Sequence, residues 1–276
     1  MRFRFTKMHG LGNDFVMLDG VSQKLIITPE RAKHISDRNF GIGCDQILLV
    51  EPPKSSDADF KYRIFNADGS EVENCGNGAR CFALFVRQRG LTNKRQIKVQ
   101  TNSGDMVLHV REDDQVTVNM GEPILEPTQI PFQAPNQQTI YGLDIEGARY
   151  EISSVSMGNP HSVMLVDDVV KFPVHIMGPL VESHINFPKK TNAGFMQIID
   201  KQNMKLRVFE RGCGETLACG TGACAAAVAA QLRGLIDTLV HINLPGGQLI
   251  IEWQGPGTPV YMTGPATTVF HGQMKL

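Results

Sequence analysis

The chain repeats itself once, at a distance of 144 residues, and this repeat restricts the fold more than any other feature of the sequence. Residues 63–91 align with residues 207–235 without a gap, and eleven of the 29 aligned positions are identical. The identities include a Cys-Gly pair in each copy, at Cys75 and Cys219. A period this long indicates two copies of a domain, because solenoid repeats have periods of about 20 to 50 residues.

Weaker similarities extend the repeat upstream. Residues 12–19 resemble residues 158–167, and both segments begin with Gly-Asn. Residues 43–47 resemble residues 194–198 through a shared Gly-x-x-Gln-Ile pattern. The duplication is therefore predicted to cover most of the chain.

The repeat also sets the predicted domain boundaries. We expect a first domain of residues 1–119 plus 265–276, which contains Cys75, and a second domain of residues 120–264, which contains Cys219. Because the last twelve residues lie beyond the second copy, we expect them to return to the first domain as a strand.

Short β-branched segments and few helices in each half favour an α/β (α+β) fold with two pseudo-symmetric domains. The strongest helix patterns follow the two Cys-Gly-x-Gly sequences: residues 79–86 carry one apolar stripe, and residues 223–232 are apolar nearly all round. Each domain is therefore pictured as a curved, mixed or antiparallel sheet wrapped around a central helix. Further elements are predicted as strands at residues 47–50, 61–65, 96–100, 105–110, 116–119, 151–154, 163–166, 196–199, 206–209, 240–243 and 249–253, and as helices at residues 29–37 and 179–183.

The composition is typical of a globular protein, and its balanced charge does not indicate a strongly charged binding partner. The chain has 27 lysines and arginines against 28 aspartates and glutamates, and its formal net charge is -1. This balance does not favour binding to nucleic acid or to an anionic membrane. The longest purely apolar run, residues 223–230, is far shorter than the roughly 20 residues that a membrane helix needs, and we find no signal-peptide pattern. We therefore expect a cytoplasmic protein.

The two repeated cysteines lie where a helix is predicted to begin. A helix N-terminus offers unpaired N–H groups and a partial positive charge, which suit a carboxylate and lower the pKa of a nearby thiol. If duplicated domains direct Cys75 and Cys219 at one bound carbon, one thiolate can remove a proton while the other thiol returns one to the opposite face. This scheme predicts stereoinversion that needs no cofactor and no metal.

Eight short motifs along the chain form a recognisable set. They are HGLGNDF at 9–15, GCDQ at 43–46, FNADGS at 65–70, ENCGNG at 73–78, MGNPH at 157–161, TN at 191–192, ERG at 210–212 and ACGTG at 218–222. With these motifs the sequence resembles the diaminopimelate epimerase family over essentially its whole length. The resemblance implies a cofactor-independent isomerase that interconverts LL- and meso-diaminopimelate for lysine and peptidoglycan precursor biosynthesis.

The resemblance also implies roles for individual residues. Cys75 and Cys219 would be the acid/base pair, His161 and Glu210 would tune the thiols, and Arg211 would bind the distal carboxylate, since its guanidinium can bind two oxygens at once. The family forms homodimers through a tyrosine near the C-terminus, where this chain has Phe270. The implied substrate-binding residues are Asn13, Gln46, Asn66, Gly76, Asn77, Asn159, Asn192, Glu210, Arg211, Gly220 and Thr221.

Other functions use the same residues differently. A proline or hydroxyproline racemase would keep both cysteines and take a smaller substrate. A thiol hydrolase or transferase would use one cysteine as a nucleophile with His161 as its base. A non-enzymatic amino-acid-binding protein, or two ordinary buried thiols, would need no proton transfer at all. The remaining cysteines are predicted to be structural: Cys44, Cys81, Cys213 and Cys224.

Overall fold

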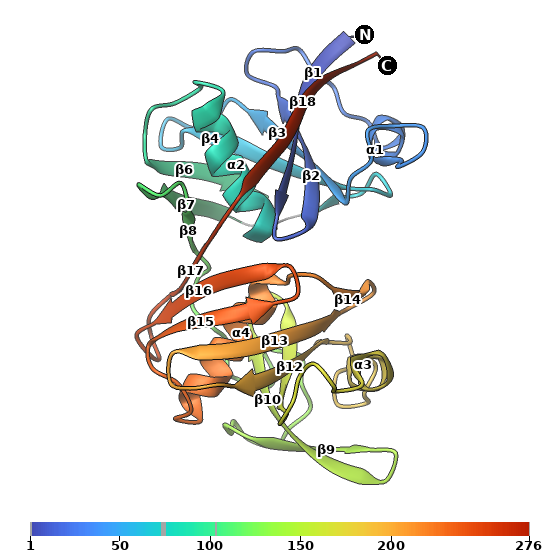
Figure 1. Cartoon of the computed structure of the whole chain (residues 1–276), viewed down its shortest axis with the longest axis vertical. Coiled ribbons are helices and arrows are strands. Elements are labelled where there is room, and N and C mark those ends of the chain that lie inside the picture. The colour runs from blue at the N-terminus through green and yellow to red at the C-terminus, as the bar shows by residue number, and fades with distance from the viewer. Residues whose placement is uncertain (1, 73–75, 103, 276) are drawn as a thin grey trace. The chain divides into compact units, whose positions relative to one another are not determined.

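The structure, a computed structural model, describes residues 2–72, 76–102 and 104–275. It divides into two compact units, of which unit 1 comprises Met1–Asn119 and Thr263–Leu276, and unit 2 comprises Met120–Met262. Each unit combines a mixed sheet with helices, as Figure 1 shows, so the predicted α/β (α+β) fold class is confirmed.

The sheet of unit 1 contains both parallel and antiparallel neighbours. Its main strands lie in the order β18, β1, β2, β3, β4, β6, β7, β8. The β2/β3 and β4/β6 pairs are parallel, the other pairs are antiparallel, and β5 adds to β4. The strands are β1 (Arg2–Gly10), β2 (Asn13–Asp19), β3 (Gln46–Glu51), β4 (Phe60–Asn66), β5 (Glu71–Val72), β6 (Gln96–Thr101), β7 (Gly104–Val110), β8 (Val116–Asn119) and β18 (Thr267–Lys275).

Unit 2 repeats the order and the directions of the first seven of these strands. Its order is β9, β10, β11, β12, β13, β15, β16, with β11/β12 and β13/β15 parallel and β14 added to β13. The duplication seen in the sequence is therefore a duplication of sheet topology. The strands are β9 (Tyr141–Ile145), β10 (Ala148–Ser156), β11 (Pro160–Leu165), β12 (Asn192–Ile198), β13 (Asn203–Glu210), β14 (Gly214–Thr216), β15 (Leu239–Leu244) and β16 (Gly247–Trp253), and β17 (Val260–Gly264) follows at the boundary of the units.

The strand register corrects one part of the sequence alignment. Phe65 faces Ile47, whereas its repeat partner Phe209 faces Ala193. Ile47 therefore corresponds to Ala193, and the predicted match between residues 43–47 and 194–198 is wrong by five residues. The shared Gly-x-x-Gln-Ile pattern misled because a short local pattern carries no information about which residues face each other across a sheet.

Each unit contains a buried central helix, α2 (Gly76–Gln88) in unit 1 and α4 (Gly220–Leu232) in unit 2, which packs against several strands of its own sheet. Both helices end in the same way. Gly90 and Gly234 adopt left-handed φ angles of 68° and 69°, and the amide of the following leucine bonds back to a carbonyl five residues earlier. This glycine-dependent helix stop explains why Arg-Gly-Leu closes both copies of the repeat.

The two peripheral helices are α1 (Pro29–Ser36) and α3 (Val174–Glu182). Helix α1 begins as predicted, with Thr28 accepting a hydrogen bond from the Arg31 amide at 3.4 Å and with proline in the first turn. The prediction that the other helix begins at Pro179 is wrong, because α3 starts five residues earlier and Pro179 lies inside it. Packing of Met177 and Val181 on the core outweighs the one backbone hydrogen bond that proline removes.

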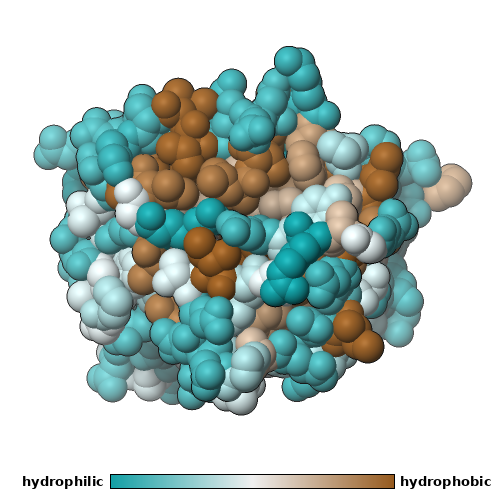
Figure 2. Space-filling model, turned by 90° about the horizontal axis from the view of Figure 1, so that it is seen from below, coloured by the Kyte–Doolittle hydropathy of each residue, from teal (hydrophilic) through white to brown (hydrophobic). Residues whose placement is uncertain are grey.

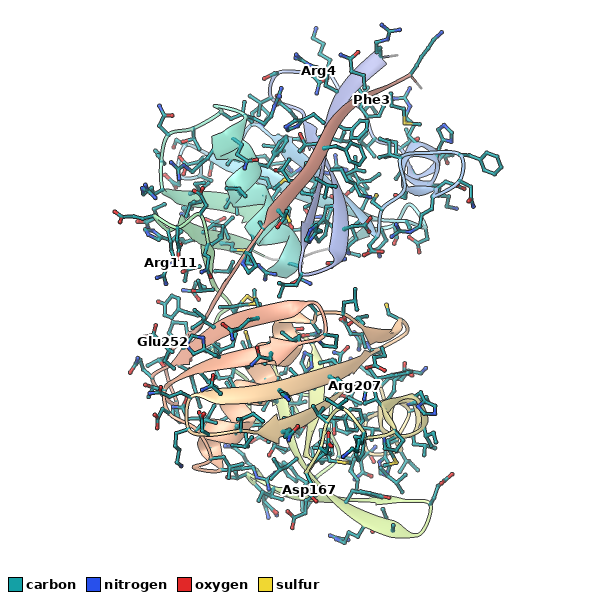
Figure 3. All side chains as sticks on the ribbon, in the orientation of Figure 1. Phe3, Arg4, Arg111, Asp167, Arg207 and Glu252 are labelled. Carbon is teal, nitrogen blue, oxygen red and sulfur yellow. The ribbon has the colours of Figure 1, made fainter. Side chains whose placement is uncertain are left out.

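A matched ion pair explains further identities of the repeat. Arg207 binds Glu215 through two hydrogen bonds of 2.6 and 2.9 Å, and Arg63 binds Glu71 in the same way at 2.8 and 2.7 Å. Arg207 is labelled on β13 in Figure 3. The pairs tie β4 to β5 and β13 to β14, and two parallel N–H···O bonds fix the relative orientation of each arginine and glutamate.

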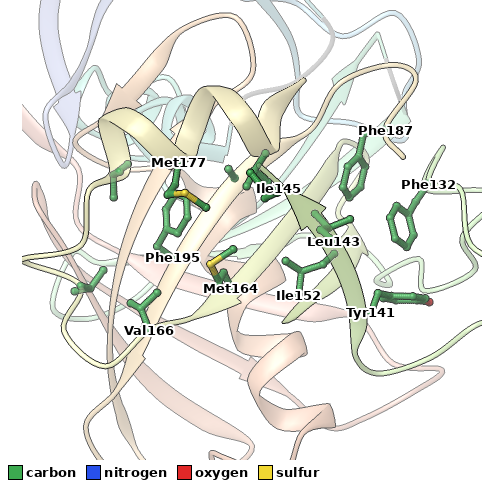
Figure 4. Packing of buried hydrophobic residues seen from close by; sticks show 14 of the residues in the cluster. Phe132, Tyr141, Leu143, Ile145, Ile152, Met164, Val166, Met177, Phe187 and Phe195 are labelled. Carbon is green, nitrogen blue, oxygen red and sulfur yellow. The ribbon is translucent and has the colours of Figure 1, made fainter. Parts of the chain in front are cut away.

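Unit 2 has a continuous apolar core beside its sheet. Phe132 stacks on Phe187 with ring centroids 4.6 Å apart and meets Tyr141 edge-on at 4.8 Å, while Met177 of α3 packs near Phe195 of β12 (Figure 4). These contacts fix α3 against the sheet. They also place the end of α3 next to the segment that leads into β12.

On the face shown in Figure 2, apolar side chains gather mostly in the upper half of the view and lie singly among hydrophilic ones below it. Over the described ranges, no helix is long and apolar enough to cross a membrane. Strands β1 and β2 were not predicted, although the alternation of Arg2, Phe3, Arg4 and Phe5 matches their exposed and buried faces. The predicted return of the chain end to the first domain as a strand is confirmed for residues 267–275, which form β18 and pair with β1.

Candidate functional site

Cys219 is the residue that caps the N-terminus of α4. Its backbone is extended, with φ -119° and ψ 110°, and only 4% of the residue is exposed. The Sγ–H group donates a hydrogen bond of 3.1 Å to Glu210 Oε2, and the Thr221 hydroxyl lies 3.6 Å from Sγ. The thiol is therefore held between a carboxylate and the first turn of a helix.

Glu210 is the last residue of β13. The chain turns back after this strand, and Cys219 comes to lie opposite the Glu210 carboxylate. Its second carboxylate oxygen, Oε1, accepts a hydrogen bond of 2.5 Å from the Thr216 hydroxyl on β14. Both oxygens thus have donors within one unit. Thr216 was not singled out in the sequence, because its role depends on β14 folding back on β13.

The structure reverses the expected direction of the Cys219 pKa. Burial raises the pKa of this thiol well above its usual value, and the negative charge of Glu210 raises it further. Hydrogen bonds from Thr221 and the Gly222 amide act in the opposite direction but are outweighed. The prediction of a lowered pKa considered only the helix terminus and omitted desolvation, which is the largest effect here. In this structure Cys219 is a thiol that can give up a proton.

His161 lies on β11 and is fully buried. Burial, followed by the charge of Arg211, lowers its pKa to about 3, so the imidazole is neutral at physiological pH. One ring nitrogen, Nε2, lies 3.2 Å from Asn159 Oδ1, while Nδ1 has no hydrogen-bond partner among the described residues. The pair places His161 and Asn159, two residues of the predicted site, side by side.

Asn192 connects two parts of unit 2. Its side-chain amide donates to the Pro160 carbonyl at 2.9 Å, and its Oδ1 accepts from the Arg211 backbone amide at 2.9 Å. Arg211 itself is exposed, and its guanidinium donates to the Lys189 carbonyl at 3.1 Å. Asn192 is buried and thereby fixes the backbone from which Arg211 projects.

Unit 1 contains two further pairs of predicted site residues. Gln46 Nε2 donates to Asn66 Oδ1 at 2.9 Å, across neighbouring strands β3 and β4. Asn77, in the first turn of α2, donates through Nδ2 to Asn13 Oδ1 at 3.3 Å. Gln46 and Leu48 lie two residues apart on β3 and therefore share a face of the strand, and Leu48 packs at Gly78 in the first turn of α2. The amide groups of both pairs therefore lie near the N-terminal end of α2.

Two charged residues hold the asparagines of unit 1, and the sequence did not suggest either. Arg80 is fully buried, donates to Asn77 Oδ1 at 3.0 Å and to the Pro265 carbonyl at 3.1 Å. Asp45 accepts a hydrogen bond of 2.9 Å from the Asn13 side chain. Arg80 lies one helical turn from Asn77, but its bond to Pro265 and the bond between Asp45 and Asn13 join residues far apart in the chain, which no local pattern could have indicated.

Glycines let the helix N-termini approach the sheet. A Cβ atom at Gly78 would lie 2.5 Å from the Tyr62 hydroxyl oxygen, and one at Gly222 would lie 3.1 Å from a Val208 methyl group. Gly76 and Gly220 are the first residues of α2 and α4 and are buried. Cys75 lies outside the described residues, so its position stays a prediction.

The other cysteines fall into two groups. Cys44, Cys81 and Cys224 are buried, which suits the structural role predicted for them. Cys213 is exposed in the turn after β13, so burial does not account for it. Within the described part of the chain, no cluster of three or more His, Cys, Asp or Glu side chains is arranged to hold a metal ion.

Comparison with known proteins identifies the family of the chain. The family model described as diaminopimelate epimerase matches residues 5–126 and 153–269. A diaminopimelate epimerase of Teredinibacter turnerae is 63% identical, and one of Pseudomonas fluorescens is 60% identical, over the full length of both chains in each case.

Solved structures with much lower identity share the fold. A PhzF-family phenazine biosynthesis protein of Bacillus anthracis superimposes with a TM-score of 0.72 at 16% identity, and covers all of both chains. A hydroxyproline epimerase of Agrobacterium vitis gives a TM-score of 0.68 at 15% identity, covering 99% of this chain and 92% of its own. From the family model and the full-length relatives, the chain belongs to the diaminopimelate epimerase family.

Proposed function

We propose that this protein interconverts LL- and meso-2,6-diaminopimelate by moving a proton at the α-carbon between two cysteines, without a cofactor. The observation that carries the proposal is the state of Cys219: a buried thiol at a helix N-terminus whose proton points at a carboxylate. The substrate is inferred from relatives that match the whole chain and are named diaminopimelate epimerase.

In one direction, the Cys75 thiolate would remove the α-proton as the Cys219 thiol delivers its own proton to the opposite face of the same carbon. Cys75 then holds a thiol and Cys219 a thiolate, so protons and charge balance. In the other direction, Glu210 is placed to accept the Cys219 proton before catalysis. His161 would stay neutral and act through its position next to Asn159.

The helix N-termini would bind the α-carboxylate of the reacting centre. Their backbone amides and partial positive charge stabilise the negative charge that develops beside the carbanion. Gly76 and Asn77 of α2, and Gly220 and Thr221 of α4, are the residues proposed for this role. The remaining polar groups of the substrate are assigned to Asn13, Gln46, Asn66, Asn159, Asn192, Glu210 and Arg211.

Incubation of the purified protein with LL-diaminopimelate in D₂O tests the mechanism. We expect deuterium at the inverted α-carbon, and loss of net epimerisation in both Cys75→Ala and Cys219→Ala. Full activity in either variant would refute the two-cysteine scheme. A parallel assay with proline distinguishes the substrate: turnover of proline alone would make the protein a racemase with the same mechanism. Activity without added pyridoxal phosphate and in the presence of EDTA tests the absence of a cofactor or metal.

We also propose a cytoplasmic homodimer, as the resemblance implies. Two neighbouring apolar residues of β18, Val269 and Phe270, are 55% and 46% exposed, and Phe270 packs edge-on against Phe5 at 5.9 Å. Exposed apolar residues on one strand are suited to pairing with a second copy. Sedimentation of the wild type and of Phe270→Lys tests this: a monomer in both would contradict it. Fractionation of cells tests the location.

A further inference from the structure

The turn that carries Arg211 is held in place from outside. It joins β13 to β14, and two glycines have left-handed backbones there: Gly212 within the turn at φ 76° and Gly214 at the start of β14 at φ 89°. Its first amide, of Arg211, bonds to Asn192 Oδ1, and its second, of Gly212, donates a hydrogen bond of 2.9 Å to Glu182 Oε1. The Cys213 amide also bonds to the Glu210 carbonyl at 3.0 Å within the turn. Because glycines add little stiffness, the Asn192 and Glu182 acceptors are the contacts that hold the closed turn against the rest of unit 2.

Glu182 occupies an unfavourable place for an acid. It is the last residue of α3, where the carbonyl ends of the helix repel a negative charge, and the residue is only 8% exposed. The carboxylate is compensated by the Gly212 amide and by Lys190, whose Nζ lies 3.5 Å from Oε1. The Glu182 carbonyl also accepts from the Thr191 amide at 3.1 Å, directly before Asn192. One residue therefore contacts both segments that support Arg211.

The corresponding turn of unit 1 is held differently. There Asp68, within the turn, accepts hydrogen bonds from the Ser70 amide and hydroxyl at 2.8 and 2.6 Å. Ala67 stands at the position that matches Arg211 in the repeat. Both turns have an internal backbone bond, from Gly69 to Asn66 and from Cys213 to Glu210. The turn of unit 1 adds an acid of its own, Asp68, whereas the turn with Arg211 is anchored by an acid from another element, Glu182.

We propose that Glu182 is a positioning residue for Arg211 and thereby a determinant of specificity for substrates with a second carboxylate. The inference rests on the proposed function, in which Arg211 binds the distal carboxylate. Bidentate binding needs a guanidinium held in one orientation. The Lys189 carbonyl accepts from the guanidinium, and Glu182 contributes by fixing the backbone next to Arg211, so that its effect on the substrate passes through Arg211.

Two substitutions of Glu182 distinguish its role as a hydrogen-bond acceptor from its role as a negative charge. Glu182→Ala removes the acceptor for the Gly212 amide, and we expect the KM for diaminopimelate to rise about tenfold to a hundredfold, the effect of losing a hydrogen bond to a charged group. The kcat should change by less than about threefold, because ground-state and transition-state binding are lost together. Glu182→Gln retains an amide oxygen for Gly212 and should recover most of the KM.

The matched control is Ser183→Ala at the adjacent position. Ser183 donates to the Pro179 carbonyl at 2.7 Å and therefore supports the end of α3 without touching the turn. This variant should keep the wild-type KM. An equal rise in KM for Ser183→Ala would show that the helix end, and not the carboxylate, is responsible, and would overturn the inference.

A double-mutant cycle with Arg211→Ala decides whether Glu182 acts through Arg211. If it does, Glu182→Ala adds little to the KM of the Arg211→Ala variant, whereas two independent effects would add. Additive effects, or a wild-type KM in Glu182→Ala, would overturn the inference. Glu182→Asp, which keeps the charge but withdraws the acceptor, completes the cycle if Glu182→Ala does not fold. A wild-type protein inactive on diaminopimelate would instead refute the proposed function.

Discussion

The two units share a sheet topology but differ in the polar groups at matching positions. The matching strands β4 and β13 end in Asn66 in unit 1 and in Glu210 in unit 2. In the parallel pair before it, Phe15 faces Gln46 and His161 faces Asn192, so Phe15 matches His161. A duplicated backbone has therefore acquired different electrostatics: neutral groups in unit 1, and a carboxylate and a buried imidazole in unit 2.

This difference bears directly on the thiol of unit 2. The negative charge of Glu210 raises the pKa of Cys219, and an asparagine at the same place could not do so. Fold and proton affinity are thus set by separate residues. The strand order depends on backbone pairing, while the pKa of the thiol depends first on burial and next on the charge of Glu210 at the end of β13.

The largest effect is expected from removing this charge. Glu210→Gln, which makes unit 2 resemble unit 1, should lower kcat by about 100-fold or more, the usual range for losing a proton acceptor. It should also lower the pKa of Cys219, so that thiolate absorbance in the ultraviolet appears at lower pH than in the wild type. The Cys219→Ser protein identifies which absorbance belongs to this thiol.

Glu215→Gln is the control for this change, because it alters charge by the same amount on nearby β14 and binds Arg207 instead of the thiol. It should leave the Cys219 titration where it is in the wild type. Identical titrations of Glu210→Gln and the wild type would break the comparison between the units.

The central helices differ in how they fill their sheets. Phe82 of α2 is fully buried and packs edge-on against Phe60 and Tyr62, whereas α4 meets its sheet with small residues such as Ala226. Phe82→Ala should reduce the free energy of unfolding by about 3–5 kcal/mol, because it leaves a cavity. Ala226→Leu should reduce it by about 1–3 kcal/mol through overpacking. Equilibrium denaturation measures both changes. An unchanged free energy of unfolding in Ala226→Leu would show that α4 does not pack tightly against its sheet at this position.

The buried histidine predicts a pH dependence of stability that unit 1 lacks at the matching position. The folded pKa of His161 is lowered to about 3, while an unfolded histidine titrates near 6.5. Between these values the unfolded chain binds a proton that the folded chain does not, so stability is complete above about pH 6.5 and falls as the pH drops. From pH 6.5 to 5 the loss should be about 1–2 kcal/mol.

His161→Phe, which introduces the residue found at Phe15, should remove this part of the pH dependence. The comparison of the two proteins cancels other groups, including Asp14, whose pKa of about 2 confines its own effect to lower pH. Parallel stability curves for wild type and variant would contradict a neutral, buried His161.

The smallest difference is expected between the two turns. Gly69 has φ 85° and a Cβ there would lie 2.5 Å from the Pro29 carbonyl oxygen, whereas Gly212 has φ 76° and open space around it. Both alanine variants pay for a left-handed backbone, roughly 1–2 kcal/mol. The free energy of unfolding should fall by about 1 kcal/mol more in Gly69→Ala than in Gly212→Ala, because the new methyl group would meet the Pro29 carbonyl oxygen. Equal melting temperatures of the two variants would mean that the segment around Pro29 moves to accommodate the added methyl group.

Much of the fold could be predicted from the sequence, because the signals are local or repeated. The duplication, the two central helices after Cys-Gly-x-Gly and the returning strand all follow from composition and spacing. Strand β1 could also have been predicted from its alternating phenylalanines. The start of α3 could not, because packing of Met177 and Val181 overrides the local effect of Pro179.

The sequence alone determined that the chain has two copies of one domain and which family it resembles, and it singled out Cys75 and Cys219 as candidates, since these follow from residue identity and spacing. Only the tertiary structure decided which side chains meet: Cys219 with Glu210, Arg211 with Asn192, and Gly212 with Glu182. It also decided the direction of the Cys219 pKa. The physical reason is that register and burial set hydrogen-bond distances and desolvation, and both depend on strands that are far apart in the chain.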